Sequence, residues 1–247
     1  MERRRWTRAL MLGLLGLSCS ALFGGDARPA AALVSGSICV GLTLYGARHQ
    51  ASEVRRPLTL IACGAGSFLF ANLVRAIHGF IAGVSNPFPS PADVFTYLGY
   101  ASVIFGMLAL IRARGGSEDR DNLIDALIVA AGVGVLGWAL LLAPYVRQAD
   151  IPFVQRLMTG GYSLLDLVLL TLTARVAVGP GARTISYYLL AAAMASVLAA
   201  NFLTTLQSSG RYDGPLLPVV ASFGYLFVAA AANHPSMRRL AEPALDT

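Results

Sequence analysis

Residues 58–81 read LTLIACGAGSFLFANLVRAIHGFI and carry a single formal charge, on Arg75. A helix of about 20 mostly apolar residues is long enough to cross a bilayer, so this stretch predicts a transmembrane helix. The composition of the whole chain agrees with this interpretation. Of its 247 residues, 56% are hydrophobic and only 13% are charged, whereas a soluble domain carries about 25% charged residues. We therefore expect an all-α integral membrane protein.

Seven further apolar stretches predict a polytopic bundle of about eight transmembrane helices. Proline, glycine and charged residues separate the stretches, as they do at helix ends. The first stretch is the weakest, because a basic segment followed by a short apolar run also begins a secretory signal peptide. Cleavage there would leave seven spans. The eight expected spans are residues 9–23, 31–47, 58–81, 94–111, 123–146, 157–178, 185–206 and 216–231.

All 19 basic residues are arginines, and they gather between the apolar stretches rather than alternating with aromatic residues on one face. This pattern is typical of membrane topology and gives no reason to expect a nucleic-acid partner. Cytoplasmic loops hold the excess of basic residues, so we expect both termini in the cytoplasm. The arginines expected on that side are Arg3, Arg4, Arg5, Arg8, Arg48, Arg55, Arg56, Arg112, Arg114, Arg120, Arg175, Arg183, Arg238 and Arg239.

A short pattern occurs twice in the chain. Residues 67–73 (SFLFANL) and 196–202 (SVLAANF) share Ser-x-Leu-x-Ala-Asn-apolar, which places Asn72 and Asn201 at equivalent positions. The repeat predicts two parallel four-helix halves, roughly 1–116 and 117–240, within a single membrane domain 1–247 that ends in a short cytoplasmic tail, 238–247. Parallel repeats occur in transporters. Chance similarity between two apolar segments is the alternative explanation.

Motifs typical of enzymes are missing from the sequence. It contains no glycine-rich phosphate loop with a lysine, no His-Glu-x-x-His, no Cys-x-x-Cys and no nucleophile elbow. The three cysteines lie within apolar stretches, and His49, His78 and His234 are expected at different depths, which argues against a metal or haem site. We therefore expect a chain without catalysis or a cofactor of its own.

Polar side chains within the spans are costly in lipid and are the candidates for function. Asp166 lies near the middle of the sixth span and should face the bundle, with Arg75 as a candidate countercharge. The alternative for Arg75 is contact with the outer headgroups, and Asn72 and Asn201 are expected first to form hydrogen bonds between helices. The expected ligand-binding cavity, open toward the outer leaflet, is lined by Asn72, Arg75, His78, Tyr97, Tyr100, Tyr162, Asp166 and Asn201.

Other polar residues near the ends of the spans have simpler explanations. Residues 90–93 place a serine at the N-cap, a proline at N1 and Asp93 at N3, which is a capping box with aspartate in the usual place of glutamate. Helix initiation alone would account for Asp93. Asp125 also begins a span, where the helix dipole favours an acid. The aromatic residues that suit an outer belt are Trp138, Tyr145 and Tyr162.

Four segments together resemble a known class of membrane region. These segments are 89–100 (PSPADVFTYLGY), 125–145, 162–166 (YSLLD) and 232–237 (ANHPSM). The chain is similar over its last two-thirds to the N-terminal multi-helix membrane region of bacterial GGDEF and EAL proteins, the diguanylate cyclases and phosphodiesterases of cyclic-di-GMP signalling, especially those of actinobacteria. In that family an acid is often found near the position of Asn201, so the amide weakens an ionic role there.

The resemblance implies a sensory or signal-input module in the bacterial plasma membrane. Its expected partners are the lipid bilayer, a small-molecule ligand, and a cytoplasmic signalling protein or a second copy of the chain. In the family a catalytic domain follows the segment equivalent to 232–237, and residues 238–247 are too few to form one. We therefore expect a stand-alone relative or the membrane part of a longer protein. The main alternative is a small secondary transporter, supported by the repeat and by Asp166; an intramembrane enzyme and a structural partner subunit rank lower.

Overall fold

The computed structural model describes residues 6–7, 27–83, 88–113, 152–178, 184–208 and 216–241, and the single residues 124, 128, 131, 132, 135 and 143. This part of the chain contains six helices that are long and apolar enough to cross a membrane. They confirm a helical bundle, whereas eight spans and the sidedness of the termini stay predictions. The expected first span, most of the fifth, and Asp125, Trp138 and Tyr145 lie outside the described residues. The elements are α2 (Ala27–Arg48), α3 (Ser52–Ala82), α4 (Ala92–Ala113), α7 (Phe153–Val178), α8 (Ile185–Ser208), α9 (Leu216–Asn233) and the short 3₁₀ helix η2 (Pro235–Ala241).

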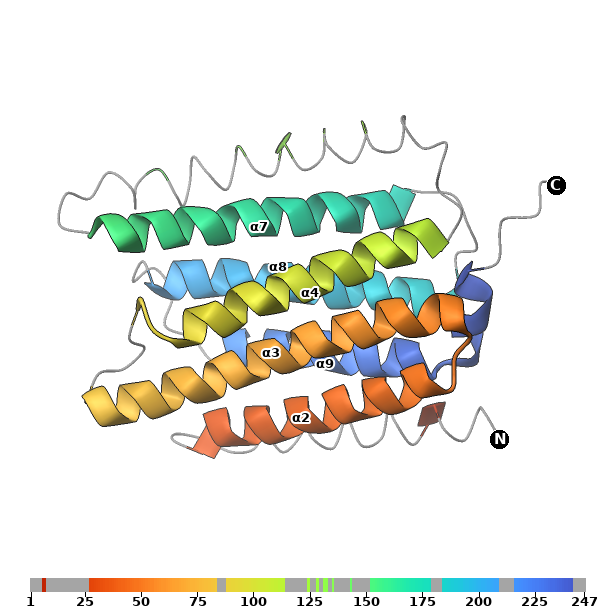
Figure 1. Cartoon of the computed structure of the whole chain (residues 1–247), viewed down its shortest axis with the longest axis horizontal. Coiled ribbons are helices and arrows are strands. Elements are labelled where there is room, and N and C mark those ends of the chain that lie inside the picture. Colours follow the sequence, from red (N-terminus) through yellow and green to blue (C-terminus); the bar gives the residue numbers. More distant parts are fainter. Residues whose placement is uncertain are drawn as a thin grey trace.

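The helices lie lengthwise beside one another and form a ring. Each contacts its neighbours in the order α2, α3, α4, α7, α8, α9 and back to α2. In Figure 1, α2 and α7 lie at opposite edges of the bundle. Helices α2, α4, α7 and α9 all end at the same end of the bundle, which we call the exit end. Helix α4 begins at the opposite end, which we call the Asp93 end. The exit end, which includes η2, is on the right in Figure 1.

Helix α3 begins earlier than expected, at Ser52 rather than at Leu58, so only residues 49–51 separate it from α2. Pro57 lies inside α3 and removes one backbone hydrogen bond. Val54 and Leu58 are both fully buried, and this burial offsets the lost bond. At its other end α3 stops at Gly83, whose φ of 65° is left-handed and whose N–H donates to the carbonyl oxygen of Gly79.

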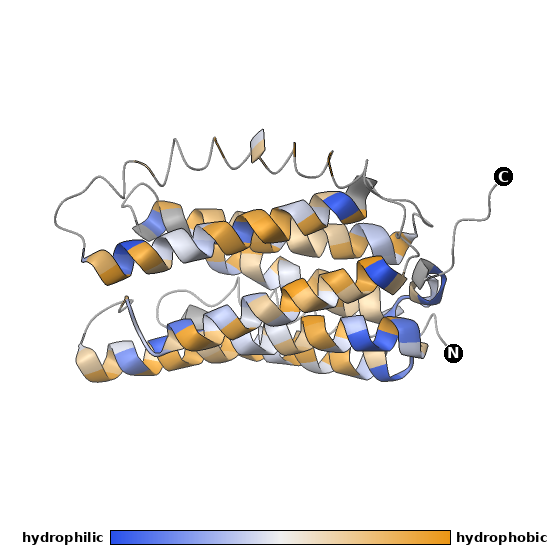
Figure 2. Ribbon diagram, turned by 45° about the horizontal axis from the view of Figure 1, so that its top comes forward, coloured by the Kyte–Doolittle hydropathy of each residue, from blue (hydrophilic) through white to orange (hydrophobic). Residues whose placement is uncertain are grey.

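Large apolar side chains cover the outer surface of the bundle. Phe80 is 89% exposed, and Ile81 and Phe153 are each more than three-quarters exposed. Figure 2 shows hydrophobic residues along the length of the helices, with hydrophilic residues mostly toward the two ends of the bundle, the exit end among them. A soluble protein rarely exposes apolar patches of this extent. The surface is that of a multi-pass membrane protein.

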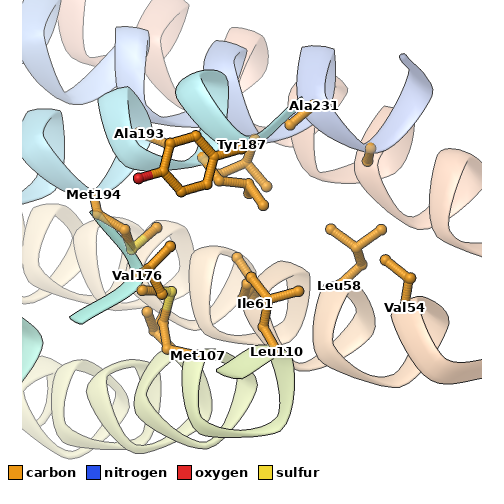
Figure 3. Packing of buried hydrophobic residues seen from close by; sticks show 14 of the residues in the cluster. Val54, Leu58, Ile61, Met107, Leu110, Val176, Tyr187, Ala193, Met194 and Ala231 are labelled. Atoms are coloured by element: carbon orange, nitrogen blue, oxygen red, sulfur yellow. The ribbon is translucent and has the colours of Figure 1, made fainter. Parts of the chain in front are cut away.

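The largest apolar core lies toward the exit end of the bundle. Residues of α3, α4, α7, α8 and α9 meet there, and several of them are fully buried. Figure 3 shows these side chains pointing from the surrounding helices into the interior of the bundle. Those labelled in the figure are Val54, Leu58, Ile61, Met107, Leu110, Val176, Tyr187, Ala193, Met194 and Ala231.

Glycines bring α3 and α4 close together. A Cβ on Gly64 would lie 2.8 Å from the carbonyl oxygen of Gly99, and one on Gly106 would lie 3.0 Å from the carbonyl oxygen of Pro57. Both distances are too short for any larger residue unless the helices move apart. Small residues at such contacts allow membrane helices to approach closely. The α3/α4 pair therefore forms a fixed wall of the bundle.

Candidate functional site

The first polar cluster lies at the Asp93 end and centres on Asp93, which is only 1% exposed. Its Oδ1 accepts hydrogen bonds from the guanidinium of Arg75 at 3.0 Å and from the hydroxyl of Tyr162 at 2.8 Å. Its Oδ2 accepts one from the backbone N–H of Ser90 at 2.6 Å. The buried carboxylate thus joins α3, α4 and α7 and has a cation as a partner.

The expected capping box forms only in part. Asp93 does accept from the N-cap N–H of Ser90, but the Ser90 hydroxyl oxygen is buried without a hydrogen-bond partner. The expectation that helix initiation alone accounts for Asp93 is incomplete, because the same carboxylate forms the ion pair with Arg75. The sequence held a signal for this pair. Arg75 needs an acid near its own depth, and the segment after α3 leads directly to Asp93.

The second polar cluster lies deeper, around Asp166. Its Oδ1 accepts hydrogen bonds from the Tyr100 hydroxyl and from Asn201 Nδ2, each at 2.7 Å. Asn201 Nδ2 also lies 2.7 Å from the Tyr100 oxygen. Tyr100 is nearly fully buried at 3% exposed. This three-membered cluster joins α4, α7 and α8, as predicted for an acid that faces the bundle and for an amide that bonds between helices.

Tyrosine rings connect the two clusters. Tyr162 stacks against Tyr97, with ring centroids 4.8 Å apart, and lies 6.2 Å from the ring of Tyr100. Phe68 of α3 meets Tyr100 edge-on at 5.4 Å. Tyr97 also donates to the backbone carbonyl of Met158 on α7 at 3.2 Å. The aromatic groups therefore fill the space between the two carboxylates and tie α7 to α4.

Six of the eight residues expected to line the cavity are brought together. They are Arg75, Tyr97, Tyr100, Tyr162, Asp166 and Asn201.

The other two residues do not join these clusters. Asn72 is exposed on α3, unlike its repeat equivalent Asn201, and His78 is half-buried with an Nδ1 that lacks a hydrogen-bond partner. The expected pairing of Arg75 with Asp166 is wrong, because Arg75 pairs with Asp93. An open cavity for a ligand stays a prediction, since the polar groups contact one another directly.

A separate set of hydrogen bonds holds the segment that follows α9. Ser236 Oγ accepts from the backbone N–H of Ser186 at 3.1 Å and lies 2.9 Å from the Ser186 hydroxyl. The backbone N–H of Ser236 donates to His234 Nδ1 at 3.1 Å. This nitrogen is therefore unprotonated, and partial burial keeps the pKa of His234 below its ordinary value. Since Met237 is fully buried, η2 is fixed against the bundle.

A small cavity of about 30 Å³ lies beside this segment, between α2 and η2. Its volume suits about two water molecules. Gln50, in the segment between α2 and α3, donates to the carbonyl oxygen of Ala232 at 2.9 Å. His49 and His234 both line the cavity, so the expectation that all three histidines lie at different depths is wrong for this pair. The residues around it are Tyr45, Gly46, His49, Gln50, Ala232, Asn233, His234, Pro235 and Arg238.

Comparisons of the chain with known protein families, with curated proteins and with solved structures gave no match. The resemblance to cyclic-di-GMP signalling proteins therefore stays a prediction from the sequence.

Proposed function

We propose that the chain is a non-catalytic integral membrane signal-input module of the bacterial plasma membrane. A ligand or a membrane property acts on the polar clusters, and the response leaves the membrane through η2. A stimulus shifts such a module only if it interacts differently with two conformations. The clusters must therefore change their hydrogen bonds between states.

The observation that carries this proposal is the position of α8. One part of α8 holds Asn201, which bonds to Asp166 in the membrane. Its first turn holds Ser186, which is fully buried and bonds to Ser236 of η2. A packed helix moves as a rigid element over this length. A change at Asp166 is thereby linked mechanically to the segment that would contact a cytoplasmic partner.

The proposal is tested in the cell that encodes the chain, by replacing the chromosomal copy with the Asp166→Leu variant. We expect the cellular cyclic-di-GMP concentration to change, because the variant removes the acceptor that holds Tyr100 and Asn201. Leu164→Ala is the matched control, since Leu164 lies on the same helix and is 63% exposed. An unchanged concentration in a normally inserted Asp166→Leu protein would contradict the signalling role.

The alternative function is a small secondary transporter. One observation favours it. Within the described residues, the carboxylate of Asp166 forms no ion pair, and an unpaired acid inside the membrane is typical of a site that binds a transported ion. The order of the helices around the ring is also the order that a parallel repeat requires, with α2, α3 and α4 equivalent to α7, α8 and α9. Solute uptake by vesicles containing the purified chain, lost in Asp166→Asn, would favour transport over signalling.

A further inference from the structure

We infer that Asp166 is a proton-binding site and that its proton loosens the first half of α7 from α4 and α8. This inference deepens the proposed function, on which it rests, by naming the proton as the stimulus. One proton converts the carboxylate into a carboxylic acid, and no other covalent bond changes.

The two acids within the bundle, Asp93, which is buried, and Asp166, which is partly buried, differ in how their charge is compensated. Asp93 has the Arg75 guanidinium, a backbone N–H and a hydroxyl around it. Asp166 has the hydroxyl of Tyr100 and the amide of Asn201, both neutral. A charge removed from water without a counter-ion is costly. Of these two acids, Asp166 is therefore the one whose charge a proton can remove without breaking an ion pair.

The described surroundings of Asp166 supply no competing charge close by. Helix α7 packs against α4 and α8. Among the described residues, the full charges near its first half are those of Asp93 and Arg75, which neutralise each other, and that of Arg156 on α7 itself. Arg156 lies ten residues before Asp166, which is about 15 Å along a helix. The titratable and polar groups that face the site are Tyr97 and Tyr100 of α4, Asn201 of α8 and Tyr162 of α7 itself.

The first half of α7 is held by hydrogen bonds and by the stacking of Tyr162 on Tyr97, without a fully buried apolar side chain among its described residues. Among the described side chains of α7, the buried ones are Leu169, Leu172 and Val176, all in its second half. The first half is attached through the carbonyl of Met158, through Tyr162 and through Asp166. Gly161 permits this approach, because a Cβ there would lie 2.6 Å from the Tyr97 hydroxyl.

A proton on Asp166 weakens this attachment. Hydrogen bonds to an ionised carboxylate are roughly twice as strong as those between neutral groups. When the carboxylate becomes neutral, the bonds from Tyr100 and Asn201 both lose this contribution. A neutral Asp166 can then face lipid, which is more costly for an ionised carboxylate than the site beside the two donors, so the proton favours the loosened arrangement. The apolar second half of α7 keeps its place, so the change is confined to residues 153–166.

Infrared difference spectroscopy on the purified full chain in lipid vesicles tests the proton site. As the pH is lowered, the wild type should gain the C=O stretching band of a carboxylic acid in an apolar setting. Asp166→Asn should lack the band, whereas Glu53→Gln, which neutralises an exposed acid at the exit end, should keep it. Tyr100→Phe and Asn201→Ala should raise its frequency, because the carbonyl loses a hydrogen bond. A wild type without a titrating band, or the same band in Asp166→Asn, would overturn the inference.

Hydrogen exchange of residues 153–166 tests the effect on α7. After correction for the intrinsic pH dependence of exchange, the wild type should exchange faster at low pH. The neutral Asp166→Asn variant should exchange fast at every pH, and an unchanged pattern in that variant would refute the link to α7. These measurements do not involve signalling. A titrating band together with unaltered cyclic-di-GMP in Asp166→Leu cells would thus reject the proposed function while the proton site stands.

Discussion

Asp93 serves two structural purposes with one carboxylate. Oδ2 completes a helix N-terminus through the N–H of Ser90, while Oδ1 pairs with Arg75 and Tyr162 from other helices. The first purpose is local and could be predicted from four consecutive residues. The second depends on which helix packs next to α4, and nothing in the local sequence encodes that. For the same reason the sequence predicted Asp166 as a bundle-facing acid but assigned it the wrong countercharge.

Removing the cation of the buried pair should destabilise the protein strongly. In Arg75→Leu the carboxylate of Asp93 stays buried without its ion-pair partner. We expect the free energy of unfolding to fall by about 3 kcal/mol, the lower end of the range for breaking a buried pair, because Arg75 is partly exposed. Unfolding in mixed micelles with increasing denaturing detergent measures the change.

The double variant Arg75→Leu/Asp93→Asn is the control for this prediction. The amide that replaces the Asp93 carboxylate is neutral and still accepts a hydrogen bond, so the double variant should lose less stability than the sum of the two single losses. Strict additivity would show that the ion pair contributes nothing to stability.

His234 predicts a pH dependence at the exit end. Burial lowers its pKa from the ordinary 6.5, so between the two pKa values the unfolded chain binds more protons than the folded one. Stability is therefore complete above the unfolded pKa and declines as the pH falls below about 6.5. The melting temperature in detergent should drop between pH 7.5 and pH 5. His234→Gln should reduce this drop, and an equal drop in that variant would assign it to other groups.

At the scale of the elements, the length of each apolar stretch was the feature of the sequence that predicted the helices reliably. Six expected spans coincide with helices because the cost of exposed backbone in lipid leaves the chain few alternatives. The start of α3 was missed because Pro57 is typical of a helix start, and the burial of Val54 that offsets it is a tertiary effect. Asn72 matched the pattern of Asn201, but it lies on the exposed face of its helix.

The close contact between α3 and α4 predicts the effect of a larger residue. Gly106→Val places atoms 2.7 Å from the side chain of Ile61 and 3.0 Å from a backbone oxygen. We expect a loss of about 2 kcal/mol in the free energy of unfolding, because the overpacked helices must separate. Gly41→Ala is the matched control. No described atom lies within 4 Å of its Cβ, so stability should stay equal or rise by up to about 1 kcal/mol.

At the scale of the whole molecule, the sequence predicted a helical membrane protein but not the order of its helices. The ring in which α4 adjoins α7 and α9 adjoins α2 arises from contacts between distant residues. This order agrees with the arrangement that two parallel halves would produce, and the repeat stays a prediction. The position of the packed core at one end and the polar clusters at the other also emerges only at this scale.

The arginine distribution predicts which end of the bundle faces the cytoplasm. Green fluorescent protein fused after residue 247 should fluoresce, and alkaline phosphatase fused there should be inactive. A phosphatase fusion within residues 84–87, between α3 and α4, should be active, because that segment is expected on the opposite side. The reverse pattern of activities would invert the orientation and place the Asp93 end in the cytoplasm.

The edge-to-face contact between Trp6 and His234, with ring centroids 5.0 Å apart, joins residue 6 to the segment after α9. A protonated imidazole quenches indole emission at such a distance. The fluorescence of Trp6 should therefore fall when His234 is protonated. A signal peptidase that removed the first apolar stretch would also remove Trp6 and abolish this signal. The second tryptophan, Trp138, lies outside the described residues, so a Trp138→Phe variant isolates the emission of Trp6.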